Sequence, residues 1–262
     1  MPALKIAIQL SGLRLPFRKA VAVAARLGAS AVEIDARGEL RPDQLGQTAL
    51  REVRRLLEEH GLRVSAVGFR TRRGYDDSNE LDRRVTATKA ALRLAADLRA
   101  AVVVNQVGRV PEEAGGPGWN QLVETLSDLG RYGHHVGATF AAHTGGCSGP
   151  VLRRLIDALG PLAIGADLDP GNLIINGFSP LGAVESLGQH ILHVHARDGA
   201  RDLARGRGLE VPLGRGTADF PALLGALENF GYRGYFTIAR EETSDAEQEF
   251  GQAVEYLNEI VH

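Results

Sequence analysis

The sequence predicts an α/β protein: a single (β/α)8 TIM barrel domain that spans residues 1–262. Short apolar runs recur along the whole chain, and segments with helical signals lie between them. The series contains eight such units, which favours a closed parallel barrel over an open sheet. The first run ends in QLSGLRLP and lacks the glycine-rich dinucleotide fingerprint, so a Rossmann fold is not expected.

The predicted strands are short and nearly continuously apolar, as strands buried on both faces should be. We expect them at residues 4–10, 30–36, 63–69, 101–108, 138–144, 162–169, 190–197 and 235–241.

Local signals mark the helices between these strands. The segment 16–29 starts with a proline and stops at Gly28, and the segment 42–61 stops at Gly61. Asp77 and Glu80 have the spacing of a capping box ahead of a helix over 81–98. The last helix is expected within 243–261, where a Ser/Asp cap precedes apolar residues at helical spacing.

Three connections are placed to shape one end of the barrel: residues 70–79, 109–119 and 198–217. The last is long for a βα connection, which favours a lid or a binding role. Within it, PLGRG (212–216) either presents backbone N–H groups to a phosphate or forms a turn.

Composition limits the classes of partner. The formal net charge is −2 and the arginines are spread over many segments, which argues against a nucleic-acid interface. No apolar run approaches the length of a membrane span, so we expect no membrane partner. The single cysteine, Cys147, rules out an internal disulfide, and no signal-peptide pattern is seen at the amino terminus. We therefore expect a cytoplasmic protein.

Three residues that can bind a metal end successive predicted strands: His143, Asp169 and His195. In a parallel barrel such strand ends gather at one mouth, where active sites are built. Two imidazoles and one carboxylate suit a divalent cation such as Zn, Mn, Mg, Fe or Co, with positions left open for substrate.

Other candidates have both a functional and a structural interpretation. Glu33 on the second strand is a candidate for proton transfer, or for an ion pair with an arginine inside the barrel. Arg197 is a candidate catalytic and substrate-binding residue that either clamps an anionic or polyhydroxyl substrate or neutralises a carboxylate. Trp119 is a candidate apolar wall for substrate, or a core residue.

Four segments together resemble the xylose isomerase-like TIM barrel family of sugar isomerases, epimerases and keto-inositol dehydratases. They are DPGNLI (169–174), HVHARD (193–198), VPLGRG (211–216) and GYRGYFTIARE (231–241). The resemblance covers essentially the whole chain. It implies a small-molecule sugar or sugar phosphate as partner, a divalent metal as cofactor, and a homo-oligomer as a common assembly.

The same resemblance exposes two departures. Family members typically bind the metal through a glutamate, an aspartate, a histidine and a glutamate that end strands five to eight. Carried over, these positions hold His143, Asp169, His195 and Ala239. In the epimerases the two glutamates move the proton, which a histidine can do and an alanine cannot. Glu241, two residues further on, is a candidate substrate-binding residue that takes over part of this role.

The sequence thus predicts an isomerase, or a related lyase, that acts on a sugar or keto-polyol. His143, Asp169 and His195 would hold the metal, His143 or Glu33 would move protons, and Arg197 would orient the substrate. The alternative is a barrel that has lost catalysis and serves as a sugar-binding or regulatory protein, as Ala239 suggests. An abasic-site endonuclease is disfavoured because it needs a multi-metal cluster and a basic phosphate-binding face.

Overall fold

The computed structural model describes residues 4–38, 40–160, 163–202 and 206–260. Within them the strands form a closed parallel barrel in the order β1-β10-β7-β6-β5-β4-β3-β2, with β1 paired to both β10 and β2. The predicted (β/α)8 fold is confirmed. The barrel strands are β1 (Lys5–Gln9), β2 (Ala31–Asp35), β3 (Arg63–Gly68), β4 (Val102–Asn105), β5 (Thr139–His143), β6 (Gly165–Leu168), β7 (Ile191–Ala196) and β10 (Tyr235–Ile238).

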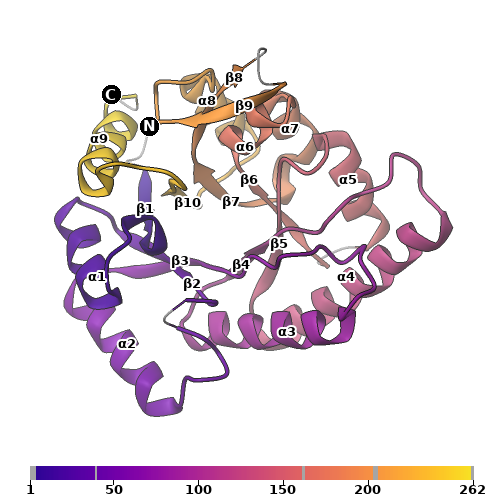
Figure 1. The fold of residues 1–262 in the computed structure, drawn as a ribbon, viewed down its shortest axis with the longest axis horizontal. Coiled ribbons are helices and arrows are strands. Elements are labelled where there is room, and N and C mark those ends of the chain that lie inside the picture. Colours follow the sequence, from indigo (N-terminus) through magenta and orange to yellow (C-terminus); the bar gives the residue numbers. More distant parts are fainter. Residues whose placement is uncertain (1–3, 39, 161–162, 203–205, 261–262) are drawn as a thin grey trace.

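Helices surround the barrel on its outside (Figure 1). They are α1 (Phe17–Arg26), α2 (Gln47–Glu59), α3 (Leu81–Asp97), α4 (Gly116–Val136), α5 (Gly149–Ala158), α6 (Pro170–Ile175), α7 (Pro180–Leu187), α8 (Phe220–Asn229) and α9 (Ala246–Glu259), with the short 3-10 helices η1 (Leu10–Leu13) and η2 (Gly188–His190). Their apolar faces and the outward-facing strand residues form the main hydrophobic core. No helix in the described part of the chain is both long and apolar enough to cross a membrane.

One helix start and one helix cap differ from the sequence prediction. Helix α2 begins at Gln47, after Gly46 in an extended conformation, and not near residue 42. The capping box predicted at Asp77 and Glu80 is wrong: Glu80 is left-handed (φ 51°) and makes no side-chain cap. The carboxylate of Asp77 accepts from the backbone N–H of Asn79, so it closes a local turn before the helix. At α9 the predicted cap is confirmed, because Asp245 accepts from the N–H of Gln248.

The barrel interior changes character along its axis. Small apolar side chains form an inner cluster of their own, separate from the main core: Ala66, Val102, Val104 and Ala141. Nearer the carboxyl ends of the strands the interior holds buried acids, imidazoles and hydroxyls, among them Glu33, Asp167 and Thr237. We call this polar end the mouth. Buried polar groups must find partners, so the mouth is where the contacts become specific.

An antiparallel hairpin of β8 (Asp198–Asp202) and β9 (Arg207–Val211) follows β7 within the predicted long connection, of which residues 203–205 lie outside the described part. Asp198 is buried and accepts from the N–H groups of Gly199, Gly214, Gly216 and Ala218. The glycine-rich segment 212–216 therefore gives the N–H groups of Gly214 and Gly216 to this carboxylate, and the N–H of Arg215 closes a turn on Pro212. The turn interpretation holds, and the phosphate cradle does not.

Candidate functional site

A single buried carboxylate organises the imidazoles of the mouth. The oxygens of Asp167 on β6 lie 2.6–2.8 Å from the nearest Nδ1 atoms of three rings, those of His143, His193 and His195. An ionised carboxylate can only accept hydrogen bonds, so each Nδ1 carries a proton and each Nε2 faces away from Asp167. Metal-binding imidazoles commonly donate their other ring N–H to a carboxylate in this way.

The outward nitrogen of His195 meets a second buried carboxylate. Its Nε2 lies 2.7 Å from Oε2 of Glu33 on β2, yet neither atom makes an aligned hydrogen bond. The other Glu33 oxygen accepts from the side-chain amide of Gln9 at 2.8 Å. A Cβ at Gly68 would come within 2.8 Å of this oxygen, so glycine leaves room for the carboxylate. The two buried atoms thus form a close ion pair without an aligned hydrogen bond.

In the pair of Glu33 and His195, attraction between opposite charges opposes the effect of burial on both pKa values and outweighs it. Burial by itself would raise the pKa of the Glu33 carboxyl, but His195, His193 and Gln9 lower it to about 2. Burial would lower the pKa of His195, but the charges of Asp167 and Glu33 raise it to about 10. The pKa of Asp167 also stays well below its usual value, despite burial, because His195 and the other imidazoles stabilise the carboxylate. The centre therefore favours a cation between Glu33 and Asp167.

Asp169, the predicted third ligand, has other partners. Its Oδ2 accepts from Nη1 of Arg197 at 2.8 Å, and its Oδ1 caps α6 by accepting from the N–H of Asn172. Nε2 of His143 is 3.4 Å from Oδ2. Burial opposes ionisation of Asp169, but Arg197 lowers its pKa. An arginine therefore supplies a positive charge to this carboxylate.

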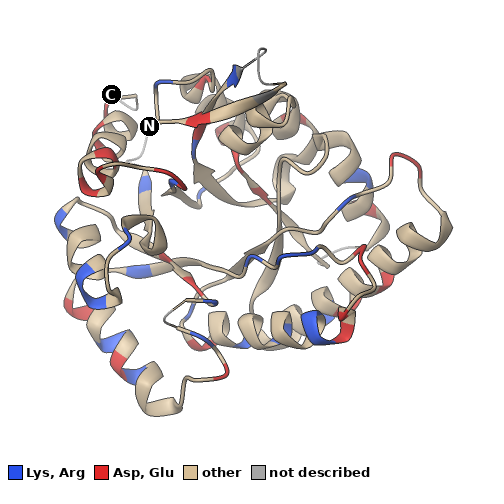
Figure 2. Ribbon diagram, in the orientation of Figure 1, with Lys and Arg blue, Asp and Glu red and all other residues tan. Residues whose placement is uncertain are grey.

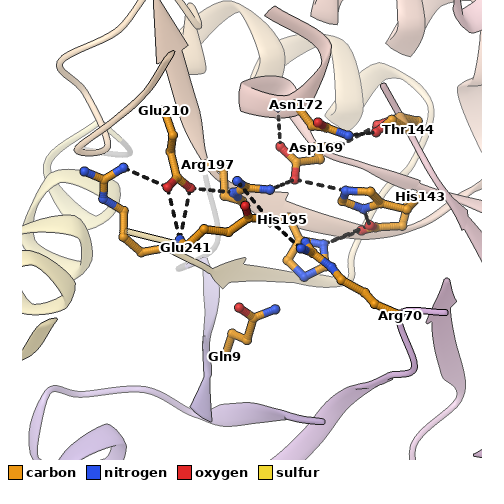
Figure 3. A network of polar contacts seen from close by, with 12 residues as sticks. Gln9, Arg70, His143, Thr144, Asp169, Asn172, His195, Arg197, Glu210 and Glu241 are labelled. Carbon is orange, nitrogen blue, oxygen red and sulfur yellow. Dashed lines mark hydrogen bonds and ion pairs between the residues drawn. The ribbon is translucent and has the colours of Figure 1, made fainter. Parts of the chain in front are cut away.

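Arg197 is enclosed by carboxylates from three elements, as Figure 3 shows. Besides Asp169 it donates through Nε to Glu210 of the hairpin at 2.8 Å, and its Nη2 is 3.4 Å from Glu241. Its side chain is only 4% exposed. Glu210 also accepts from the backbone N–H of Glu241, which ties the hairpin to the end of β10.

A cavity of about 550 Å³ opens at the mouth beside Glu33. Its lining includes Gln9, Glu33, Arg37, Arg70, Arg240 and Glu241. Arg70 pairs with the half-exposed Glu241. Burial would raise the pKa of the Glu241 carboxyl, but Arg197 and Arg70 lower it below its usual value. A small polyhydroxyl ligand would meet ionised carboxylates and guanidinium groups here.

Two groups of side chains have ligand atoms close enough to hold one metal ion. They are Glu33, His193 and His195, and His143, Asp167 and His195. His195 belongs to both, and the predicted ligand His143 to one, while Asp169 is in neither. The assignment of His143, Asp169 and His195 as a set stays a prediction.

Two further positions bear on the predicted site. Ala239 is buried directly after β10, on the face of Thr237 by strand alternation, and offers no ligand. Trp119 lies on α4, buried in the main core with the guanidinium of Arg154 over its ring, so its contacts are those of a packed residue. Its role in substrate binding stays a prediction.

Sequence reasoning missed the most connected residues. Asp167 was visible only as the residue two positions before Asp169, on the same strand face, and Gln9 and Glu210 carried no motif. Arg70 lies in a predicted mouth loop, but nothing in its neighbours indicated a contact with Glu241.

Family models, curated proteins and solved structures provide three comparisons for the chain. A model described as "Xylose isomerase-like TIM barrel" matches residues 21–260. No curated protein matches the sequence significantly.

Solved structures share the fold at low sequence identity. A xylose isomerase domain protein from Planctomyces limnophilus is 22% identical, with a TM-score of 0.87 over 99% of this chain and 98% of that one. A xylose isomerase-like TIM barrel protein from Mycobacterium smegmatis, in complex with magnesium, is 16% identical (TM-score 0.77; 99% and 97%). D-psicose 3-epimerase from Clostridium cellulolyticum H10, solved with D-tagatose, is 14% identical (TM-score 0.78; 99% and 100%).

Proposed function

Because the chain belongs to the xylose isomerase-like TIM barrel family, we propose that it is an isomerase or epimerase of a small sugar or keto-polyol. The proposal includes one divalent cation at the mouth. Family relatives in the solved structures include a magnesium complex and an epimerase with a bound sugar, which supports both parts.

The observation that carries the proposal is the close contact of two buried atoms, Glu33 Oε2 and His195 Nε2, which lie 2.7 Å apart without an aligned hydrogen bond. Both residues could serve as ligands of a divalent ion, which would take the place of the proton that His195 otherwise carries. His193 completes a two-histidine, one-carboxylate set, since its Nε2 lies 3.9 Å from the same Glu33 oxygen. At present that Nε2 is 2.8 Å from the hydroxyl of Thr237, which can turn to Ser65 instead.

The donor set explains which metals suit the site. Two imidazoles and one carboxylate suit Zn, Mn, Fe or Co better than Mg, which prefers oxygen ligands. Asp167 and Gln9 position the ligands. Asp167 accepts from Nδ1–H of His193 and His195 and so holds both rings in that tautomer, and Gln9 donates to the carboxylate of Glu33. When bound, the cation supplies Lewis-acid polarisation of a carbonyl and its neighbouring hydroxyl.

The chain's own groups move the proton. His143, fixed by Asp167 through Nδ1, offers the lone pair of Nε2 to a substrate C–H or O–H. Glu241, which reaches the mouth although β10 ends at Ile238, supplies the second acid/base group that Ala239 lacks. Arg197 orients Glu241 and Asp169, and Arg70 is the guanidinium that a substrate hydroxyl or carboxylate meets first.

One observation favours a second function, a sugar-binding or regulatory barrel without turnover. The ion pair of Asp169 with Arg197 puts a guanidinium where the family places metal charge, and Ala239 removes one family acid/base group. Binding would survive both changes, because hydroxyl recognition by arginines and carboxylates does not need them.

Metal analysis followed by isotope exchange separates the two functions. Protein purified without chelator is assayed for bound metal, and a panel of sugars and keto-polyols is incubated in D2O. Carbon-bound deuterium in the sugar supports the isomerase; saturable sugar binding without exchange supports the binding protein.

The ligand assignment has its own test. We expect His195→Ala to abolish metal binding, with the exposed His134→Ala as the matched control that retains it. Stoichiometric metal in purified His195→Ala protein would refute the assignment.

A further inference from the structure

A second cavity, of about 650 Å³, lies beside the mouth between the connections that follow β2 and β3 and the helix α3. We call it the arginine pocket. Its described lining includes two carboxylates, Asp43 and Glu80, and six arginines: Arg37, Arg41, Arg72, Arg73, Arg83 and Arg84. Figure 2 shows basic positions repeated along the segment between β3 and α3 and at the start of α3. The pocket therefore has an excess of positive charge.

Half of these guanidinium groups are neutralised locally. Arg41 pairs with Asp43 at 2.7 Å and Arg83 with Glu80 at 3.0 Å. Arg73 lies 3.3 Å from Asp77.

The other half have no carboxylate within ion-pair distance among the described residues. Arg37 donates to the main-chain carbonyl of Arg70, and Arg84 donates to the carbonyls of Asp77 and Asn79. Nε of Arg84 is buried with no partner. Arg72, on the loop before α3, makes no hydrogen bond or ion pair within the described ranges. Carbonyl contacts fix a guanidinium in place but leave its charge unneutralised.

The arginine pocket and the mouth are adjacent. Arg37 lines both cavities, and its neighbours Ala36 and Phe69 follow the ends of β2 and β3. A ligand whose reacting carbons lie over Glu33 therefore has a path, past Arg37, to Arg72 and Arg84.

We propose that the arginine pocket binds the phosphate monoester of a phosphorylated sugar or polyol whose reacting carbons occupy the mouth. The proposal rests on the proposed function for the role of the mouth. A phosphate carries about two negative charges and three acceptor oxygens, so it can neutralise several guanidinium groups at once, which a neutral sugar cannot do. The glycine-rich segment 212–216 is no competitor, because Asp198 takes its N–H groups.

Inorganic phosphate is the first probe, since its binding needs no turnover. Phosphate is titrated into the intact protein by calorimetry at low ionic strength, with wild type, Arg72→Gln and Arg83→Gln compared. Both substitutions replace a guanidinium that lines the pocket with an amide, but Arg83 is already paired and its side chain is 82% exposed. We expect Arg72→Gln to weaken phosphate about tenfold and Arg83→Gln less than about twofold. Undetectable phosphate binding by wild type, or equal losses in the two variants, overturns the proposal.

Arg84 provides a second variant with a structural contribution. Arg84→Lys keeps the charge but loses the buried Nε and the fork that reaches two carbonyls, so we expect partial loss of phosphate affinity, with Arg84→Gln losing more. A urea midpoint measured on each variant separates weaker binding from weaker folding.

Turnover distinguishes failure here from failure of the proposed function. If the protein converts sugar phosphates, Arg72→Gln should raise KM about tenfold with kcat nearly unchanged, because the phosphate lies away from the reacting carbons. If phosphate binds through Arg72 but no sugar exchanges deuterium, the arginine pocket stands and the isomerase fails. If neutral sugars are converted and Arg72→Gln changes neither phosphate binding nor KM, the arginine pocket fails and the isomerase stands.

Discussion

Two arginine-rich regions border the mouth, and they use the same side chain differently. The guanidinium groups of Arg197 and Arg240 both meet carboxylates: Asp169, Glu210 and Glu241 surround the first, and Glu210 and Glu249 the second. In the arginine pocket, half of the guanidinium groups bind only main-chain carbonyls or have no partner among the described residues. The first region holds the hairpin and the strand ends together, while the second keeps charge available for a ligand.

Burial accounts for this difference. The side chain of Arg197 is 4% exposed, so its charge must be neutralised by the protein itself. Carboxylates raise its pKa against the effect of burial. Arg72 in the arginine pocket is exposed, so water can solvate its charge and it needs no internal partner. A guanidinium without a carboxylate is therefore informative only where water can reach it.

The largest effect should come from removing the buried charge. Arg197→Met leaves the carboxylates of Asp169 and Glu210 buried without their main cation, which costs about 3–5 kcal/mol. Urea denaturation of the two proteins measures the difference. A loss no larger than that of Arg72→Gln would contradict the contrast between the two regions.

The pH dependence of the metal-free protein should show the next largest effect. The pKa of Glu33 is lowered to about 2 in the folded protein, so its contribution is present above about 4.5 and is lost as the pH falls towards 2. The pKa of His195 is raised to about 10, so its contribution is present below about 6.5 and is lost as the pH rises towards 10. We expect stability to be highest between about pH 4.5 and 6.5, measured by denaturation in EDTA from about pH 2 to about pH 10. A profile with its maximum above pH 8 would disagree.

Loosening the hairpin should have a smaller effect. Glu210→Gln keeps the shape but weakens the contacts to Arg197 and to the backbone N–H of Glu241, with a cost of about 1–3 kcal/mol. Hydrogen exchange of β9 amides should accelerate before that of β7. Uniform acceleration in both strands would mean that the hairpin is not held separately.

The smallest effect should come from the arginine pocket itself. Exposed ion pairs contribute little, so Arg83→Gln should change the free energy of unfolding by about 0.5 kcal/mol or less. Arg72→Gln should change it no more, since Arg72 has no described partner. Thermal denaturation with and without phosphate compares these two variants further. Arg72→Gln should lose stabilisation by phosphate, and Arg83→Gln should keep it.

The fold was predictable because each strand carries its own signal. Runs such as 63–69 and 101–108 are apolar on both faces, and glycines such as Gly28 mark helix stops, so strand number and order follow from local pattern. The site was predictable only in part. Strand ends pointed to His143 and His195, but the partner of a side chain depends on the opposite wall of the barrel.

The sequence by itself determined an eight-stranded barrel with imidazoles and acids at one end, because hydrophobic periodicity and strand ends are local properties of the chain. Only the tertiary structure decided that Asp167 is shared by three imidazoles, that Arg197 takes Asp169, and that Glu33 faces His195. These contacts join residues far apart in the chain. Closure of the barrel sets their distances, and burial makes each pairing costly to change.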